Sequence, residues 1–160
     1  MASGIAGGAI SGVRVTSTPE APVQVAVRVG GQGRAIELLQ VDGPVRTGVE
    51  VLAGASATLQ GSTFAVPGTA VTLAPRSQVD ATGNVFVSST ARGAAPAGRR
   101  GVPVAAPAVS AITMGDGARV ALRGNVFAGF GANPVQGLPD GEREPMRAAN
   151  VVVADASTFR

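Results

Sequence analysis

The segment Ala81-Thr82-Gly83-Asn84-Val85-Phe86 recurs further along the chain as Leu122-Arg123-Gly124-Asn125-Val126-Phe127. A third copy, Leu59-Gln60-Gly61-Ser62-Thr63-Phe64, precedes both, and weaker copies span 10–15 and 36–41. The full copies share the pattern apolar-x-Gly-x-x-apolar. Self-similarity at a period of about 20 to 50 residues is typical of solenoid and other repeat architectures. The segment therefore predicts a chain built of stacked, equivalent units.

A second set of positions keeps step with these segments. It consists of alternating apolar pairs: Val27/Val29, Val49/Val51, Val71/Leu73, Ile112/Met114 and Val151/Val153. The first three pairs start at 27, 49 and 71 and are 22 residues apart, whereas the next two gaps are 41 and 39. Short runs with period-two alternation, interrupted every few positions by Gly, Asn or Pro, predict β-strands and not helices.

Both long gaps return to 22 residues if the chain carries two inserts. The inserts fall at about 88–109 and 129–148, because 41 minus 19 and 39 minus 17 each give 22. Both are rich in Gly, Pro and other loop-forming residues. We therefore predict an all-β right-handed parallel β-helix of about five coils with two loop inserts, forming a single domain over 1–160. A sandwich or barrel is the alternative, but only a solenoid requires equivalent positions of successive coils to stack in register.

Three columns of this repeat have a direct physical interpretation. The glycine column predicts a sharp corner with positive φ where a Cβ would clash. The polar residue after each glycine is expected to form a hydrogen-bond ladder along the corner, and the phenylalanines an internal aromatic stack. The members are Gly12, Gly61, Gly83 and Gly124 for the corner, Ser62, Asn84 and Asn125 for the ladder, and Phe64, Phe86 and Phe127 for the stack.

In these features the chain resembles the right-handed parallel β-helix repeat proteins of the pectate-lyase-like superfamily. The resemblance covers about 9–87, 111–128 and 150–159. Its most specific motif is Gly-Asn-Val-Phe at 83–86 and 124–127, which follows Ala-Val-Thr-Leu or Ala-Ile-Thr-Met. The superfamily includes lyases, hydrolases, epimerases, adhesins and non-catalytic domains, so it implies a fold and not one activity. More narrowly, the chain is similar to non-catalytic β-helix segments that some bacteria attach to protein kinases and other multidomain proteins.

The repeat is cut at both ends of the chain. The copy that starts at Ile10 has no preceding apolar pair, and the pair at Val151/Val153 would be followed by its glycine segment near 161, just past Arg160. Neither end carries an evident amphipathic capping helix. Because an uncapped solenoid exposes apolar core and unpaired strand edges, we expect the chain to be part of a longer protein, or its ends to be covered by another chain or an adjacent domain.

The composition excludes several classes of function. The chain has no Cys, which rules out disulfides and thiolate metal sites, and no His, Trp or Tyr. All 13 basic residues are Arg, they are mostly scattered, and the net charge is only +3, so no nucleic-acid partner is expected. All-Arg usage suggests a GC-rich bacterial source. Neither a signal peptide nor an 18-residue apolar run is present, so no membrane insertion is expected and the compartment stays open.

No enzymatic residue is predicted. Catalysis of the pectate-lyase kind would need clustered carboxylates to hold Ca²⁺, with Arg or Lys as the base. Glu50 aligns in the coil with Thr72, Thr113 and Val152, and Asp80 with Thr58 and Ala121, so each carboxylate stands alone. The glycine-rich runs 30–33 and 115–117 fit tight turns better than phosphate loops. The sequence therefore predicts no catalytic residue, no metal ligand and no cofactor.

The two inserts are the most informative functional feature. Both are expected to leave the coil after the Phe strand, at one corner of adjacent coils, and to form a contact surface. The candidate contact residues are Arg92, Arg99, Arg100, Asp140, Glu142, Arg143 and Glu144. The competing interpretation is that the opposite charges of the two loops only pair with each other, or that the loops are mobile.

The leading hypothesis is a non-catalytic scaffold or interaction domain of a larger bacterial protein, with a protein as its partner. The alternatives are a fragment or relative of a carbohydrate-active lyase or hydrolase, with carbohydrate as the ligand, and an adhesin or tail-spike segment.

Overall fold

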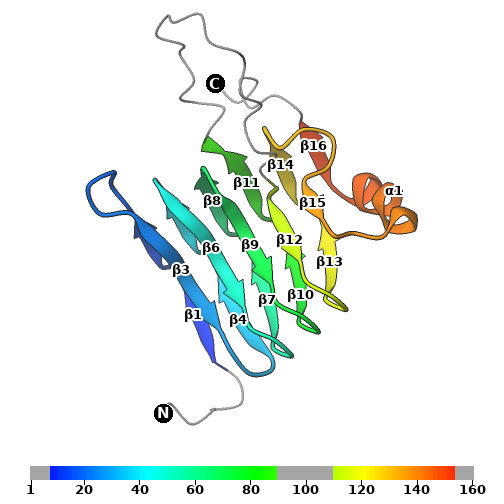
Figure 1. The fold of residues 1–160 in the computed structure, drawn as a ribbon, viewed down its shortest axis with the longest axis horizontal. Helices are drawn as coiled ribbons and strands as arrows, with labels where there is room; N and C mark the ends of the chain where they lie inside the picture. The colour runs from blue at the N-terminus through cyan, green and yellow to red at the C-terminus, as the bar shows by residue number, and fades with distance from the viewer. Residues whose placement is uncertain (1–7, 90–109, 154–160) are drawn as a thin grey trace, which may run out of the picture.

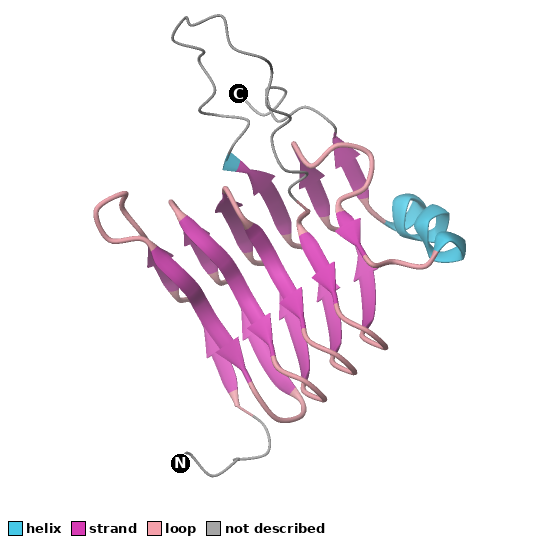
Figure 2. Ribbon diagram, in the orientation of Figure 1, coloured by secondary structure: helices cyan, strands magenta, loops and turns pink. Residues whose placement is uncertain are grey.

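From β1 to β15, successive strands of this chain join three parallel sheets in rotation. The computed structural model describes residues 8–89 and 110–153. Each of these turns adds one strand to each sheet, and the turns advance along one axis (Figures 1 and 2). The fold is an all-β, right-handed parallel β-helix of about five coils, which confirms the predicted fold class.

The three sheets are named here in the order in which the chain first enters them. Sheet 1 contains β1 (Ala9–Ser11), β4 (Arg34–Glu37), β7 (Ser56–Gln60), β10 (Gln78–Thr82) and β13 (Arg119–Arg123). Sheet 2 contains β2 (Arg14–Thr16), β5 (Gln40–Asp42), β8 (Thr63–Val66), β11 (Val85–Ser88), β14 (Val126–Ala128) and β16 (Val151–Val153). Sheet 3 contains β3 (Val23–Val29), β6 (Val45–Val51), β9 (Thr69–Leu73), β12 (Ile112–Met114) and β15 (Val135–Gln136). The α-helix α1 (Asp140–Ala149) lies between β15 and β16 in the chain.

The pairing register confirms the 22-residue coil. Val49 pairs with Val71, and Phe64 pairs with Phe86, so equivalent positions of neighbouring coils lie side by side. Ile112 pairs with Val71 although it follows it by 41 residues. An insertion of 19 residues therefore lies between β11 and β12, as predicted. Residues 90–109 of the connection between these two strands are outside the described residues.

The core runs along the coil axis and contains the predicted aromatic stack. The rings of Phe64 and Phe86 have centroids 5.3 Å apart and an interplanar angle of 10°, and those of Phe86 and Phe127 are 4.9 Å apart at 8°. All three side chains are fully buried. Parallel strands spaced about 4.8 Å apart force identical rings at one position to stack in this way.

Positive φ is what the corner between sheets 1 and 2 requires. Gly61, Gly83 and Gly124 have φ of 56°, 64° and 61°, which confirms the predicted backbone conformation. The predicted Cβ clash is wrong for Gly83 and Gly124, because a Cβ at either would meet nothing within 4 Å. The preference for glycine therefore arises from local backbone sterics. Leu38 occupies the same corner one coil earlier than Gly61, at φ 52°.

We expect the substitution Leu38→Gly to stabilise the protein. The left-handed conformation is unfavourable for leucine, and the side chain is 63% exposed, so little packing is lost. The free energy of unfolding, measured by urea denaturation, should rise by about 0.5–1 kcal/mol. Leu38→Ala is the control, since it also removes the exposed side chain but keeps the strained φ. A glycine variant no more stable than the alanine variant would contradict this account.

The polar ladder at this corner is confirmed and is longer than predicted. The backbone amides of Ser62, Asn84 and Asn125 each donate a 2.9 Å hydrogen bond to the side-chain oxygen of the asparagine one coil further on. The last acceptor in the series is Asn150, which the sequence reasoning did not include. The side-chain amide of Asn125 also donates to the Ala81 carbonyl across the corner, at 2.9 Å. The ladder thus satisfies backbone groups that the buried corner would otherwise leave unpaired.

The assignment of Val151/Val153 to the apolar-pair column is wrong. Val152 pairs with Phe127, which places β16 in sheet 2 after the Phe strand β14. The residue that continues the apolar-pair column is Val135, which pairs with Ile112 after a normal coil of 23 residues. Residues 151–153 are all valine, so the sequence shows no alternation that could tell which of them faces inward, and Val152 is the one in the Phe127 column.

The second predicted insert is therefore not a loop insert. Residues 129–148 contain β15, which belongs to the regular coil, and most of α1. The helix occupies the position in the last coil that a sheet 1 strand would otherwise take, beside β13 (Figure 1). Met146 is its buried residue. The expectation that neither end carries a capping helix is thus wrong for the C-terminal end of the coil.

Candidate functional site

The structure brings four of the predicted contact residues together on α1. Asp140, Glu142, Arg143 and Glu144 follow one another along the first half of this helix, and all are exposed. The other three predicted contact residues, Arg92, Arg99 and Arg100, lie outside the described residues. The predicted composite surface of two loops is therefore untested, and its described half is the exposed side of a helix at the end of the coil.

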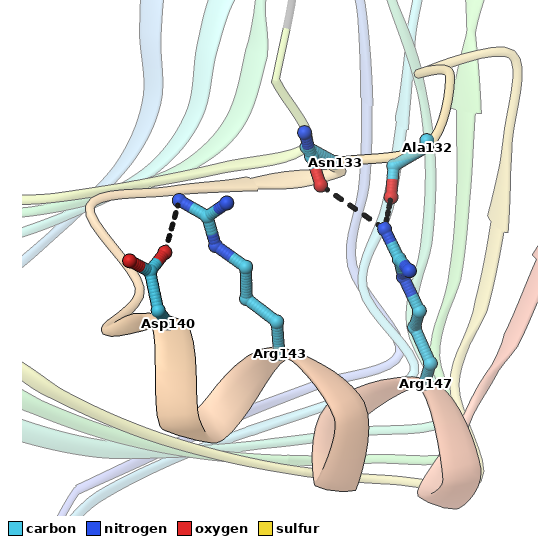
Figure 3. A network of polar contacts seen from close by, with 5 residues as sticks. All are labelled: Ala132, Asn133, Asp140, Arg143 and Arg147. Atoms are coloured by element: carbon cyan, nitrogen blue, oxygen red, sulfur yellow. Dashed lines mark hydrogen bonds and ion pairs between the residues drawn. The ribbon is translucent and has the colours of Figure 1, made fainter.

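A small polar network attaches α1 to the coil (Figure 3). The guanidinium of Arg147 donates from Nη2 to the carbonyl of Ala132, at 2.9 Å, and to Oδ1 of Asn133, at 3.2 Å. Arg143 Nη2 lies 3.2 Å from Asp140 Oδ1 in an exposed ion pair one turn apart on the helix. Exposed pairs of this kind contribute less than about 1 kcal/mol. The main role of Arg147 is structural, because it ties the helix to the turn before β15.

At the C-terminal end of the coil, helix α1 packs beside the edge strand of sheet 1. Leu122 in β13, Leu138 before the helix and Met146 in α1 are each less than a tenth exposed and belong to the common core. A hollow remains between the two elements, lined by Val120 and Leu122 of β13 and by Pro145 and Met146 of α1. The helix therefore covers part of the sheet 1 edge at this end.

The N-terminal end is open in the part of the chain that the structure describes. The strands β1, β2 and β3 each pair with a neighbour on one side only. Their core-facing side chains are half-buried, whereas the same columns are at most 1% exposed one coil later: Ile10, Val15, Val23 and Val27 against Ile36, Val41, Val45 and Val49. An apolar hollow at this end includes Ile10, Val29 and Ile36, with Arg28 and Arg34 beside them.

The outward rows of the coil bear isolated carboxylates. Glu50 forms an ion pair with Nε of Arg28 across neighbouring coils, at 2.5 Å. Its row continues through Thr72 and Thr113 to Gln136, and not to Val152 as predicted. Within 8–89 and 110–153, no group of three or more acidic, His or Cys residues is placed to hold a metal ion.

Asp80 lies on the outward face of sheet 1, next to Thr58 and Ala121 as predicted. A shallow hollow on this face is lined by Asp80, Thr82 and Arg123, among others. Hydrogen bonds from its own backbone and from Thr18 lower the pKa of Glu20, which is fully exposed in the turn before β3. None of these groups is enclosed in the way that a tuned catalytic acid or base requires.

Searches against protein-family models, curated proteins and solved structures find no match to this chain. The exposed core positions of the first coil are therefore the main basis for a functional proposal. At ten residues, α1 is too short to cross a membrane.

Proposed function

We propose that this chain is a non-catalytic β-helix domain that acts as a scaffold for protein–protein contact, and that its open N-terminal end is the contact surface. The observation that carries the proposal is the difference in exposure between equivalent core positions. Val27 is half-buried in the first coil, whereas Val49 in the next coil is 1% exposed.

The chemistry of this end favours a protein partner. Within the described residues, the three edge strands have no neighbouring strand on one side, and between them lies an apolar surface. A polypeptide that adds strands can satisfy both the hydrogen bonds and the apolar surface, as in other cases of strand addition to a free edge. A sugar offers no comparable set of backbone groups. The side chains on which proteins usually stack a sugar ring, Trp and Tyr, are absent from the chain.

We further propose that the coil is related to the pectate-lyase-like β-helices of bacteria. The rotation among three parallel sheets, the asparagine ladder and the stacked phenylalanines support this relationship. The alternative of a carbohydrate-active relative rests on the hollow beside Asp80 and Arg123 on sheet 1. Robust cleavage of an acidic polysaccharide, measured with and without Ca²⁺, would favour that alternative over a scaffold.

Site-specific photo-crosslinking tests the scaffold proposal. A photoreactive amino acid at Gln24, which is exposed on the free edge strand β3, should crosslink the chain to protein in cells of the source organism. The same probe at Gln60, an exposed glutamine in the middle of the coil, should give little crosslinking. Mass spectrometry of the linked peptides identifies what lies against the edge. Equal labelling from both positions, or none from Gln24, would contradict the proposal.

A further inference from the structure

The hollow between β13 and α1 is a part of the coil interior that the last turn leaves unfilled. In sheet 1 the residues Ala57, Val79 and Val120 form one inward column, and Val79 is 1% exposed because it has a neighbour in the column on each side. Val120 is only half-buried, since the element beside β13 is the helix α1 and not a further strand (Figure 1). A helix cannot approach a strand edge to the spacing of about 4.8 Å that a paired strand reaches. A space of about 260 Å³ remains.

The walls of this hollow are apolar and belong to the common core. Leu122 of β13, Leu138 before the helix and Met146 of α1 are each less than a tenth exposed, and Val120 packs against the same core. An apolar cavity of about 150 Å³ holds a benzene ring, whereas sites for drug-sized ligands begin at about 300 Å³. The hollow lies between these sizes, so it suits a ligand with one branched aliphatic or aromatic group and few further atoms.

Two opposite charges line the same hollow. Arg123 is the last residue of β13, and Glu142 lies in the first turn of α1. Glu142 shares one face of the helix with Met146 and Ala149, because residues three or four apart along a helix lie on the same side. Within 8–89 and 110–153, the side chains of Arg123 and Glu142 form no ion pair with each other or with any other residue. Each charge is therefore available to a ligand.

We infer that the hollow binds a free apolar α-amino acid of the size of leucine or phenylalanine. The ligand side chain fills the space beside Val120 and Leu122, the ligand carboxylate binds the guanidinium of Arg123, and the ligand ammonium binds the carboxylate of Glu142. Arginine suits the first contact, because its planar guanidinium can donate two parallel hydrogen bonds to one carboxylate. A fatty acid or an alkylamine would leave one of the two charges without a partner. The inference is independent of the proposed function, since no residue of the first coil takes part.

Isothermal titration calorimetry of the 160-residue chain with L-leucine tests the ligand class. We expect one saturable site with a Kd of roughly 0.1–1 mM, because the ligand has few atoms and the hollow is open to solvent. Two analogues isolate the charges, since isocaproate lacks the ammonium and isopentylamine lacks the carboxylate. Each should bind at least about tenfold more weakly than leucine. The inference is overturned if neither leucine nor phenylalanine gives saturable binding, or if either analogue binds as tightly as leucine.

Two pairs of variants locate the binding site. Glu142→Gln and Arg123→Gln should each raise the Kd for leucine about tenfold, because each removes one charge-assisted contact. Glu144→Gln and Arg119→Gln are the matched controls and should leave the Kd unchanged, since they remove the same charges from the same helix and strand at residues that do not line the hollow. All four side chains are exposed, so we expect every variant to fold like the parent chain. A control that weakens binding as much as its partner variant would overturn the assignment.

Discussion

Replacing Phe86 with alanine is expected to lower the free energy of unfolding by about 3–5 kcal/mol. Phe86 is the central ring of the stack, with centroid distances of 5.3 Å to Phe64 and 4.9 Å to Phe127, and its side chain is fully buried. Truncation therefore removes two ring contacts and leaves a cavity inside a coil that cannot collapse without breaking the sheet pairing on either side. Denaturation in urea, followed by far-UV circular dichroism, measures the loss.

Phe86→Leu separates the loss of volume from the loss of stacking. Leucine fills most of the space, so this variant should lose only about 1–1.5 kcal/mol. Because neighbouring coils depend on each other, both variants should also weaken hydrogen-exchange protection of the amides in β8 and β14. If Phe86→Ala lost less than about 1 kcal/mol, the stack would not be part of a tightly packed interior, and the account of the core given above would be wrong.

The features that could be predicted from the sequence are those that stacking repeats. A column such as Phe64, Phe86 and Phe127 is visible because each coil places the same residue in the same environment, about 4.8 Å from the last. The positive-φ corner, the asparagine ladder and the insertion between β11 and β12 follow from the same register. The fold class could therefore be predicted from the repeat alone.

The last coil could not be predicted because it departs from the repeat. The helix α1 contains Gly141 and Pro145, which are ordinarily signals of a turn or a helix end, and it follows a Leu-Pro pair. Its helical state depends on packing against β13, a tertiary contact that local sequence does not show. Asn150 was overlooked for the same reason, since its place in the ladder becomes visible only once β16 is assigned to sheet 2.

The candidate contact residues were predicted from charge and loop composition, and only half of that prediction can be compared with the structure. Charged residues on an exposed helix are common and indicate little about binding. Open edges were expected at both ends of the coil, and among the described residues α1 lies beside only the sheet 1 edge at the C-terminal end.

Replacing Asn125 with alanine is expected to destabilise the corner ladder by roughly 2–6 kcal/mol, because two buried groups lose their partners at about 1–3 kcal/mol each. The backbone amide of Asn84 loses the acceptor Oδ1 of Asn125, and the carbonyl of Ala81 loses the donor Nδ2. Asn125 is fully buried, so water cannot readily replace either bond. Urea denaturation of the variant and the parent chain measures the difference.

Asn125→Ser is the matched control that the chain itself supplies. Ser62 occupies the same column, and its hydroxyl oxygen accepts a 3.1 Å hydrogen bond from the backbone N–H of Leu39. A serine at 125 can therefore accept a hydrogen bond from the backbone N–H of Asn84 in the same way. It cannot replace the side-chain N–H that Asn125 donates to the Ala81 carbonyl. Stability should fall by about half as much as in the alanine variant. Equal losses of stability in the two variants would mean that the asparagine side chain acts through its volume and not through the hydrogen bond that it accepts from the Asn84 N–H.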